Sequence, residues 1–597
     1  MVISQEKILE SLKTHFGYSS FRFNQEQIIK DVLDKKNVLT IMPTGGGKSI
    51  CFQLPALLME GTAIVISPLI ALMKDQVDAL KANDIPAAFI NSSQDSTINY
   101  QVLKMLNDNK LKLLYIAPES LANIFPQIPN VKISLFAIDE AHCISSWGHD
   151  FRPAYTQLGY LKKKFPEIPI AAFTATADKA TRKDIVDQLN VPDATVHISS
   201  FDRPNLFLEV RPANNRLNQI LKFLDARPFE SGIIYCLSRK STESITAKLN
   251  KSGHKAKAYH AGLSAEERID IQESFIANET PIIVATIAFG MGIDKGNVRF
   301  VIHYNLPKNI EGYYQEIGRG GRDGLPSQSL LFYSFADVIQ LRQFIDDATN
   351  KEYQNAKLDR MQQYAEANSC RRVVLLNYFG EFGAENCNNC DVCLAPPKYF
   401  DGTLIAQKVC SGIARLKEQE STGMVIDVLR GAQNAQVLEK KYQHIKTYGI
   451  LKNTSWLDLQ QYIIQMINQG ILEIRFHEKG RLLLTKLAKD ILFENKQVSL
   501  VSIQKFVAAQ KVQKIQKEIL NVDAALFQKL KELRLKIAKE ENLPAFVIFN
   551  DASLRDMADR QPQNLTDFEK ISGVGAVKLE KFGQQFLEVI VDHLALE

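Results

Sequence analysis

Two successive stretches of this chain each alternate short apolar runs with longer segments of helical periodicity. Between Asn37 and Thr176 the apolar runs are VLTIM, TAIVIS, LKLLYIA, SLFAID and IAAFTAT, and after Ser231 they are GIIYCLS, KAKAYHA, PIIVAT, VRFVIHYN and SLLFYS. Strands rich in Val, Ile and Leu that alternate with helices are typical of a parallel sheet covered by helices. The sequence therefore predicts an α/β fold with two tandem lobes. We place their junction at residues 201–215, where FDRPN and RPANN supply turn residues without apolar periodicity.

The chain changes character after about Asp337, where helical patterns replace this alternation. A cysteine cluster follows, and Pro396 and Pro397 are expected to end that unit. Farther on, ILEIRF and RLLLT flank the residues HEKG, which predicts a β-hairpin, and helices followed by a hairpin favour a winged helix. At 597 residues, the chain has room for several domains of ~100 to 200 residues. The expected divisions are 1–205 (first lobe), 206–336 (second lobe), 337–400 (helical, with the cysteines), 401–495 (winged helix), 496–520 (basic linker) and 521–597 (small helical domain).

Composition places the chain among ordinary globular proteins. Hydrophobic residues make up 45% and charged residues 23% of it, and no run reaches the ~18 apolar residues that a bilayer crossing needs. The start MVISQEKILE lacks the pattern of a secretory signal, so we expect cytoplasmic residence. A net charge of +5 is too small to demonstrate an anionic partner. Residues 479–520 carry nine Lys or Arg against three Asp or Glu, which suits either phosphate contacts or a solvated face.

A glycine-rich loop directly after VLTIM is the first candidate site. Residues 43–49 read PTGGGKS and precede a helical pattern that begins near Ile50. Glycines let a backbone wrap a phosphate, the lysine supplies a positive charge and the serine can ligate magnesium. The strict motif has a glycine where this chain has Met42, and a glycine turn beside a surface lysine is the alternative. We predict an ATP site whose loop residues are Thr44, Gly45, Gly46, Gly47, Lys48 and Ser49, with Ser49 on Mg²⁺.

Two adjacent carboxylates, Asp139 and Glu140, follow at the end of the run SLFAID. A buried strand that ends in paired carboxylates loses solvation energy unless a cation or a water molecule needs them. We therefore expect Asp139 to hold magnesium, directly or through water, and Glu140 to orient or deprotonate an attacking water. A solvated acidic turn is the alternative. Together with the phosphate loop, the pair predicts hydrolysis of a nucleoside triphosphate without saying what the hydrolysis drives.

The second lobe carries QEIGRGGRDG, in which Arg319 and Arg322 are three residues apart. On a helix this spacing puts both side chains on one face, from which they can reach the γ-phosphate held by the first lobe. An arginine finger of this kind is worth ~10³ to 10⁵ in rate. Paired arginines alone are usually surface residues, but these follow an α/β lobe without a phosphate loop of its own. We expect both to lie on a helix and to take part in catalysis.

Four of the eight cysteines cluster late in the chain. Cys370 precedes LLNYFGEFG, and Cys387, Cys390 and Cys393 follow at C-x2-C intervals. Four thiolates at this spacing fit a closed, tetrahedral structural zinc site that leaves no position open for catalysis. An iron–sulfur cluster is the alternative, because C-x2-C-x2-C also occurs in ferredoxins.

These residues together resemble the RecQ helicases of superfamily 2, from about Phe16 to the last helical unit. SPLIALMKDQ, YIAPE, DEAH, FTATA, IIYCLSR, VATIAFGMGIDK and QEIGRGGRDG follow in the helicase order. The resemblance implies two RecA-like parallel-sheet lobes, a helical zinc-binding subdomain with Zn²⁺ on the four cysteines, a winged helix and a small all-α HRDC-like domain. Two positions depart from the family pattern: Gly320, where RecQ proteins usually have alanine, and Asp294, where asparagine is also common.

The resemblance also assigns residues around the nucleotide base. FGYSSFRFNQEQ is similar to the family's adenine-reading motif. It implies that Tyr18 stacks, that Arg22 contacts ATP and that Gln25 contacts the edge of the base.

Candidate DNA contacts lie in the segment CISSWGHDFRP, residues 143–153. Trp147 and Phe151 offer flat faces for bases, and His149 and Arg152 offer phosphate contacts, a composition suited to single strands, although loop packing is the alternative. The segment resembles the aromatic-rich loop that couples DNA binding to ATP hydrolysis in RecQ proteins. The winged helix and the last domain resemble a duplex-binding module and an auxiliary nucleic-acid binder. In the hairpin turn His477 is a candidate for stacking on a terminal base pair, against the alternative of a solvated histidine.

We therefore expect an enzyme, a Mg-ATP-dependent DNA helicase that translocates on single-stranded DNA and unwinds duplex or branched DNA in recombination and repair. The 3′ to 5′ polarity is implied by the resemblance alone. A single-strand-binding protein and repair factors are the expected partners, without a membrane, and association with a bacterial nucleoid is the expected location within the cytoplasm. The alternatives are an RNA-remodelling ATPase of the DEAD-box type and a non-catalytic protein that bridges DNA.

Overall fold

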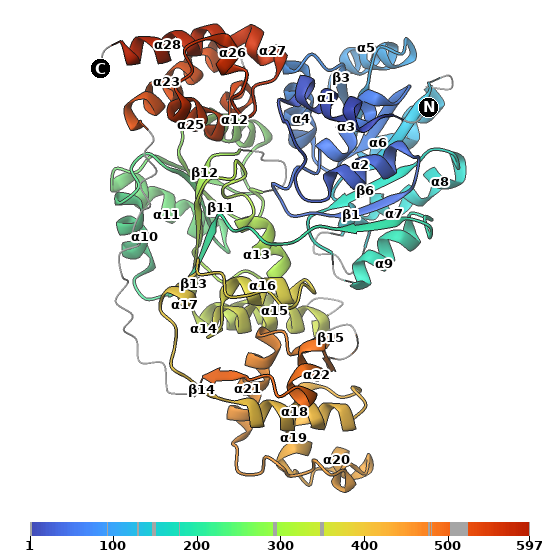
Figure 1. Ribbon diagram of the computed structural model, residues 1–597, viewed down its shortest axis with the longest axis vertical. Coiled ribbons are helices and arrows are strands. Elements are labelled where there is room, and N and C mark those ends of the chain that lie inside the picture. Colours follow the sequence, from blue (N-terminus) through green and yellow to red (C-terminus); the bar gives the residue numbers. More distant parts are fainter. Residues whose placement is uncertain are drawn as a thin grey trace.

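The computed structural model describes residues 3–91, 94–127, 131–145, 151–177, 179–290, 295–346, 351–475, 478, 480–501, 523–541 and 543–595. Two α/β lobes lie side by side (Figure 1), with a helical subdomain under the second lobe, a winged helix below that and a helical C-terminal domain above. Within these residues, no helix is both long enough and apolar enough to cross a membrane.

The first lobe is built on a seven-stranded sheet in the order β3-β4-β2-β5-β6-β1-β7. Its neighbouring strands are all parallel. The strands are β1 Val38–Ile41, β2 Thr62–Ile66, β3 Ala87–Ile90, β4 Leu113–Ile116, β5 Ile133–Ile138, β6 Ile170–Thr174 and β7 Thr195–Ile198. The helices are α1 Gln5–Phe16, α2 Gln25–Leu33, α3 Ile50–Leu58, α4 Ile70–Ala82, α5 Ser96–Asn107, α6 Pro118–Ile124, α7 Pro153–Thr156, α8 Tyr160–Lys164 and α9 Lys179–Gln188. Every residue of β2 and β5 is buried, because helices cover both faces of the sheet.

The second lobe repeats this plan with six strands in the order β10-β11-β9-β12-β13-β8. Here too the neighbouring strands are parallel. The strands are β8 Leu206–Pro212, β9 Ser231–Tyr235, β10 Ala256–Tyr259, β11 Ile282–Ala285, β12 Val298–His303 and β13 Ser327–Tyr333, and the helices are α10 Arg216–Asp225, α11 Arg239–Lys251, α12 Ala265–Ile276 and α13 Ile310–Ile317. Separate apolar clusters lie on the two faces of this sheet.

Each apolar run quoted from the sequence forms a strand, which confirms the two-lobe prediction. The absence of regular structure expected at the junction 201–215 is wrong, because β8 occupies most of it. Leu206, Leu208 and Val210 share one face of β8, and Phe207 and Glu209 lie on the other. The apolar run is short, and the turn residues of FDRPN and RPANN flank it. The edge strands β3 and β7 were not among the predicted runs either.

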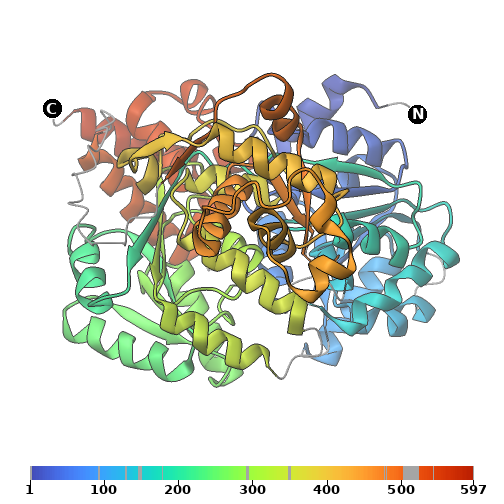
Figure 2. The same ribbon diagram turned by 90° about the horizontal axis from the view of Figure 1, so that it is seen from below.

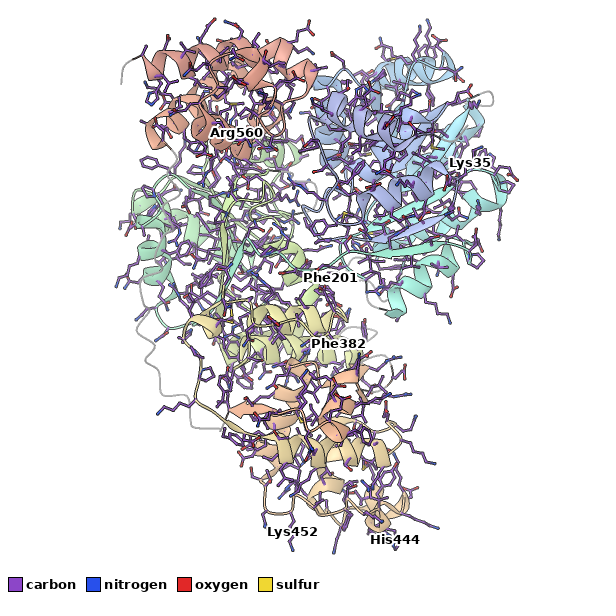
Figure 3. The ribbon with its side chains drawn as sticks, in the orientation of Figure 1. Lys35, Phe201, Phe382, His444, Lys452 and Arg560 are labelled. Carbon is purple, nitrogen blue, oxygen red and sulfur yellow. The ribbon has the colours of Figure 1, made fainter. Side chains whose placement is uncertain are left out.

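A helical subdomain follows the second lobe, with α14 Phe335–Ile345, α15 Lys351–Ala365, α16 Arg371–Tyr378 and α17 Asp391–Leu394. Its apolar residues belong to the same core cluster as residues of both lobes. In Figure 3, Phe201, from the segment that joins the lobes, lies directly above the helices of this subdomain. The subdomain is therefore fixed to the junction of the two lobes.

The winged helix has its own apolar core. Its elements are β14 Tyr399–Asp401, α18 Thr403–Arg415, α19 Thr422–Arg430, α20 Ala435–Glu439, α21 Trp456–Asn468, β15 Leu472–Arg475, β16 Arg481–Leu484, α22 Lys486–Phe493 and β17 Ser499–Val501. The antiparallel pair β15 and β16 confirms the predicted hairpin. A second antiparallel pair, β14 and β17, joins the first and last strands of the domain. Figure 2, seen from below, shows this domain in front of the two lobes.

The C-terminal domain is a bundle of helices around an apolar core of its own. It contains α23 Ala524–Glu540, α24 Ala545–Ile548, α25 Asp551–Arg560, α26 Leu565–Phe568, α27 Ala576–Lys578 and α28 Gln584–Leu594. The buried guanidinium of Arg534 pairs with Asp551 at 2.8 Å and donates to the carbonyl of Phe549 at 2.7 Å. A buried charge with these partners holds α23 against the segment between α24 and α25.

Candidate functional site

The glycine-rich loop lies between β1 and α3 and is shaped by backbone conformations that favour glycine. Gly45 and Gly47 have φ of 80° and 81°, in the left-handed region where a Cβ is unfavourable. A Cβ on Gly46 would lie 2.7 Å from Cγ of Met42, so Met42 packs directly against the loop at the place where the strict motif has glycine. The ammonium of Lys48 donates to the carbonyl of Met42 at 3.2 Å, and Ser49 stands at the start of α3. The predicted order of strand, loop and helix is therefore present.

Asp139 and Glu140 follow β5 directly, on the same sheet as the loop. Burial, together with the neighbouring Glu140 carboxylate, raises the pKa of Asp139 to about 7, and Lys48 opposes that shift. Tyr155 donates its hydroxyl hydrogen to the carbonyl of Asp139 at 3.0 Å. A cation beside Asp139 would favour its charged form, since an opposite charge lowers a carboxyl pKa.

Glu140 has a φ of 47°, which is uncommon for a residue with a side chain. His142 lies 3.3 Å from a Glu140 carboxylate oxygen and 2.9 Å from the hydroxyl of Thr174 in the FTATA segment. Backbone strain of this kind is kept only where surrounding contacts enforce it, and it concentrates at functional sites. The contacts of His142 tie the acidic pair to the end of β6.

Three residues near the N-terminus form the side of the cleft where the sequence places the nucleotide base. The side-chain amide of Gln25 donates to the carbonyls of Gly46 and Gly47 at 3.1 Å each, and its oxygen accepts from the backbone nitrogen of Arg22 at 2.9 Å. The guanidinium of Arg22 lies 5.9 Å from the ring centre of Tyr18. Gln25 is therefore bonded to the phosphate loop itself in this structure, and Tyr18 and Arg22 lie beside it.

Arg319 and Arg322 reach the same cleft from the second lobe, but the expectation that they share a helix is wrong. α13 ends at Ile317, and the arginines lie in the turn segment that follows. Gly318, Gly320, Gly321 and Gly324 disfavour helix here, and Gly321 has a φ of 58°. A Cβ on Gly45 would be 3.2 Å from Cγ of Arg322, so this side chain packs on the phosphate loop.

Arg319 is buried, and its Nε has no hydrogen-bond partner among the described residues. A buried guanidinium nitrogen without an acceptor costs ~1–3 kcal/mol, which a phosphate oxygen in the cleft would recover. The turn thus carries a buried guanidinium nitrogen without a described acceptor, on a residue that lines the cavity between the lobes.

A cavity of about 370 Å³ lies between the lobes and brings the predicted nucleotide residues together. Its lining includes Tyr18, Arg22, Gln25, Thr44, Gly45, Gly47, Lys48, Ser49, Asp139, Glu140, Arg319 and Arg322. Loop, acidic pair and arginines from two lobes therefore share one space. The arrangement can bind a triphosphate, neutralise its charge from both sides and place a carboxylate near an attacking water.

The C-terminal domain also lines this cavity, which the sequence did not predict. Its contributing residues are Phe546, Val547, Asn550, Gly573 and Lys578. The backbone nitrogen of Gly573 donates to the carbonyl of Gly17 at 3.3 Å. Gly17 has a φ of 73°, and a Cβ there would come within 2.7 Å of the Gly575 nitrogen, so the two glycine turns touch backbone to backbone. Glycine turns carry no side-chain pattern that marks them as partners.

Ion pairs flank this backbone contact. Lys13 of the first lobe pairs with Glu569 at 3.3 Å, and Asp84 of the first lobe pairs with Lys581 at 3.0 Å. Lys539 pairs with Glu279 of the second lobe at 3.5 Å. These exposed pairs are individually weak, but together they hold the C-terminal domain next to α1 and above the second lobe (Figure 1), where it lines the cavity.

The sulfur atoms of Cys370, Cys387, Cys390 and Cys393 lie within 4.8 Å of one another. Zinc–sulfur bonds of ~2.3 Å place tetrahedral ligands ~3.8 Å apart, and the Cys387 and Cys393 sulfurs are 4.0 Å apart. Backbone nitrogens donate to three of these sulfurs at 3.3–3.4 Å, which favours thiolates. Arg371, beside the first cysteine, pairs with Asp391 at 3.0 Å. The cluster fits a structural zinc ion.

The candidate DNA contacts are only partly within the described residues. Trp147, His149 and His477 lie outside them. Phe151 is 43% exposed, and the guanidinium of Arg152 donates to the carbonyl of Pro68 at 2.9 Å. The backbone nitrogen of Arg152 donates to the carbonyl of Cys143 at 2.9 Å, so the end of the loop is fixed close to Glu140.

The sequence matches five families of helicase domains, one after another along the chain. The chain matches the DEAD/DEAH box helicase family over residues 22–185, the helicase conserved C-terminal domain over 214–324, the RecQ zinc-binding family over 335–394, the RQC domain over 396–508 and the HRDC domain over 523–590. It is 46% identical to the ATP-dependent DNA helicase RecQ of Pasteurella multocida over 600 residues, covering 99% of this chain and 94% of that protein. The chain belongs to the RecQ family.

Two further RecQ relatives span the chain to a similar extent. The Haemophilus influenzae protein is 44% identical over 602 residues, covering 100% of this chain and 97% of its own length, and the Bacillus subtilis protein is 39% identical over 589 residues, covering 97% and 98%. As a RecQ helicase, the chain is an ATP-dependent enzyme that acts on DNA and uses ATP, Mg²⁺ and a structural Zn²⁺. This result favours the DNA helicase over the RNA-remodelling ATPase and over the non-catalytic bridging protein.

Proposed function

We propose that this RecQ helicase translocates 3′ to 5′ on single-stranded DNA and separates duplex or branched DNA ahead of it. The cleft supports this proposal most directly, because Lys48 from one lobe and Arg319 and Arg322 from the other line one cavity. A triphosphate bound there is touched by both lobes, so binding and hydrolysis would close and reopen them. The domain limits given above stay predictions.

We assign each lining residue a role in hydrolysis. Lys48 and the amides of residues 44–47 bind the phosphates, Tyr18 stacks on the base, Gln25 contacts its edge and Arg22 contacts ATP. Mg²⁺, on Ser49 and Asp139, would neutralise phosphate charge. Glu140 orients a water and accepts its proton as the water attacks the γ-phosphorus. Arg319 and Arg322 stabilise the charge that develops as ADP leaves.

Coupling to DNA is proposed to run through the segment 143–153. Its end is bonded back to Cys143, three residues from Glu140, and Arg152 is bonded to Pro68 after β2. Single-stranded DNA held by Trp147, His149, Phe151 and Arg152 would shift this segment and with it the acidic pair. His477 is proposed to stack on the base pair at the fork.

The test is unwinding and ATP hydrolysis on matched substrates. Wild-type protein should unwind duplexes with a 3′ tail, fail on those with only a 5′ tail, and hydrolyse ATP faster with single-stranded DNA than with RNA of equal length. Lys48→Ala should abolish both activities, and fully duplex blunt DNA serves as the control. Unwinding of the 5′-tailed substrate alone would reverse the polarity, and equal stimulation by RNA would contradict the assignment of DNA as the track.

We also propose a nucleoid location and contacts with a single-strand-binding protein and repair factors. The support is indirect: a motor on single strands meets the proteins that coat them. Co-purification that survives DNase digestion would demonstrate a protein contact, and its loss would show that DNA alone bridges the two.

A further inference from the structure

The segment that joins the two lobes carries a half-buried arginine, Arg203, directly between the phosphate loop and the arginine turn. We propose that Arg203 is a positioning residue that holds the turn 318–323 in register with the phosphate loop, so that Arg319 and Arg322 meet the transferring phosphate. The proposal rests on the function assigned to that turn above.

The guanidinium of Arg203 bonds both lobes at once. Its Nη1 donates to the carbonyl of Thr44, in the phosphate loop, at 2.6 Å and to that of Gly318 at 3.3 Å. Its Nη2 donates to the carbonyls of Gly320 and Gly321 at 2.8 Å and 3.0 Å. One planar group therefore links the residue before the loop glycines to the backbone on both sides of Arg319.

The phosphate loop and the arginine turn approach each other closely around Arg203, so that a side chain at Gly45 or Gly318 would be tight. A Cβ on Gly45 would be 3.3 Å from Nη1 of Arg203, and a Cβ on Gly318 would be 3.0 Å from Cβ of Thr44. Asn205, two residues along, donates to the carbonyls of Gly321 and Leu325 at 2.8 Å and 2.9 Å. The joining segment thus grips the arginine turn at several points.

The backbone on either side of Arg203 is itself anchored by the zinc-binding subdomain. The carboxylate of Glu381 accepts from the hydroxyl of Ser200 at 2.8 Å and from the backbone nitrogen of Phe201 at 3.0 Å. The amide of Asn389, which lies between two of the cysteines, donates to the carbonyl of Pro204 at 2.8 Å. The Phe201 and Phe379 rings stack with centres 4.4 Å apart (Figure 3 labels Phe201). Arg203 therefore projects from a fixed support.

A guanidinium suits this role because of its shape. It is planar and presents its donors as a fork, whereas a lysine ammonium is a point charge that cannot hold two separate backbone segments in one plane. Arg203 is fully engaged by carbonyls, so we do not assign it to the phosphate. Its effect should appear when charge develops on the transferring group, since only interactions stronger in the transition state raise the rate.

The experiment compares Arg203→Ala and Arg203→Lys with Arg227→Ala. Arg227 is a matched control: like Arg203 it is half-buried and donates to a backbone carbonyl, that of Phe223 at 3.2 Å, and it donates to Gln328 at 2.7 Å, but it lies in the second lobe away from the cleft. For each protein, DNA-stimulated kcat and KM for ATP, the affinities for ADP and for ADP with aluminium fluoride, and the melting temperature are measured. Arg319→Ala and Arg322→Ala are measured in parallel.

We expect both Arg203 variants to lose about ten- to hundred-fold in kcat, a part of what an arginine finger supplies. Affinity for ADP should stay within threefold, and affinity for the aluminium fluoride complex should fall at least tenfold. Arg227→Ala should change none of these values by more than twofold.

Two results overturn the inference. In one, Arg203→Ala matches the Arg227→Ala control in kcat and in analogue affinity. In the other, ADP affinity falls by the same factor as kcat and the melting temperature falls as well, which would show that Arg203 stabilises the fold and does not act on the transition state. If Arg319→Ala and Arg322→Ala both hydrolyse ATP like wild type, the finger assignment itself is wrong. If those two variants are inactive while Arg203→Ala is normal, the finger assignment stands and only the positioning role of Arg203 is wrong.

Discussion

At the scale of single residues, Glu140 is the side chain whose chemistry is most separable from binding. It has an unfavourable φ and contacts His142, and it is not one of the groups assigned to the phosphates. Glu140→Gln keeps the shape but cannot accept a proton, so turnover should fall by ~10² to 10⁴. ATP binding, followed with a fluorescent analogue, should persist. A variant that hydrolyses ATP at the wild-type rate would exclude Glu140 as the base.

Lys295 gives a prediction about pH. Its side chain is buried, with the ammonium donating to the carbonyl of Phe275 at 2.6 Å, and burial lowers the pKa of Lys295 to about 7. In the unfolded chain a lysine titrates near ~10.4. Between these values the unfolded state binds more protons, so the free energy of unfolding rises with pH, by at most ~1.4 kcal/mol per unit.

The measurement compares melting temperatures of wild type and Lys295→Met at pH 7, 8 and 9. Other titrating groups affect both proteins alike. The melting temperature of the wild type should increase relative to that of Lys295→Met as the pH increases. A constant difference in melting temperature across the series would show that Lys295 is charged in the folded state.

At the scale of elements, the arginine turn holds a residue where this chain departs from the usual RecQ pattern. A Cβ on Gly320 would lie 2.5 Å from the hydroxyl of Ser327, which donates to the carbonyl of Val298 at 3.2 Å. Gly320→Ala should therefore destabilise the second lobe by ~1–3 kcal/mol through overpacking. Thermal unfolding of Gly320→Ala, Ser327→Ala and the double variant tests this. Recovery in the double variant is expected, and simple additivity would place the cost elsewhere.

The zinc site is predicted to support the cleft as well as its own subdomain. Cys387→Ser should lose zinc, measured by metal content, and should lower the melting temperature, because metal binding is part of the folding free energy of such units. Asn389 and Glu381 anchor the segment that joins the lobes, so ATP turnover should fall in parallel. Full ATPase activity in zinc-free protein would show that the two sites are independent.

The elements also show what the sequence could predict. Buried strands were predicted from apolar runs such as TAIVIS and SLFAID. The phosphate loop and the acidic pair were predicted from residue types and spacing, whereas Tyr18, Arg22 and Gln25 came from the resemblance to the RecQ family alone. β8 was missed because its apolar run, Leu206 to Leu208, is short and is flanked by the turn residues of FDRPN and RPANN. The turn at Arg319 and Arg322 was mistaken for a helix because spacing was weighed above the glycines. Arg203 gave no signal, since its role depends on carbonyls brought together only by the fold.

At the scale of the whole molecule, the docked C-terminal domain forms part of the wall of the nucleotide cavity, where we expect it to restrict the exit of ADP. Its contacts with the first lobe include the Lys581–Asp84 and Lys13–Glu569 pairs. Lys581→Glu combined with Lys13→Glu should weaken docking and speed the release of a fluorescent ADP, and the wild-type rate should approach the variant's as salt screens the pairs. Adding Asp84→Lys to Lys581→Glu restores an ion pair of reversed sign at this contact and should slow ADP release again. Unchanged ADP release in the double variant would mean that the domain does not restrict the exit.

The pairing of β14 with β17 has a consequence for how such a molecule can change. The winged helix begins and ends on two adjacent strands, so the chain leaves it at the point where it entered. Its removal, enlargement or exchange would leave the distance from the zinc-binding subdomain to the start of residues 502–522 almost unaltered. The domain is thus attached to the rest of the chain through a two-stranded stem, and its exchange would keep the entry and exit points adjacent.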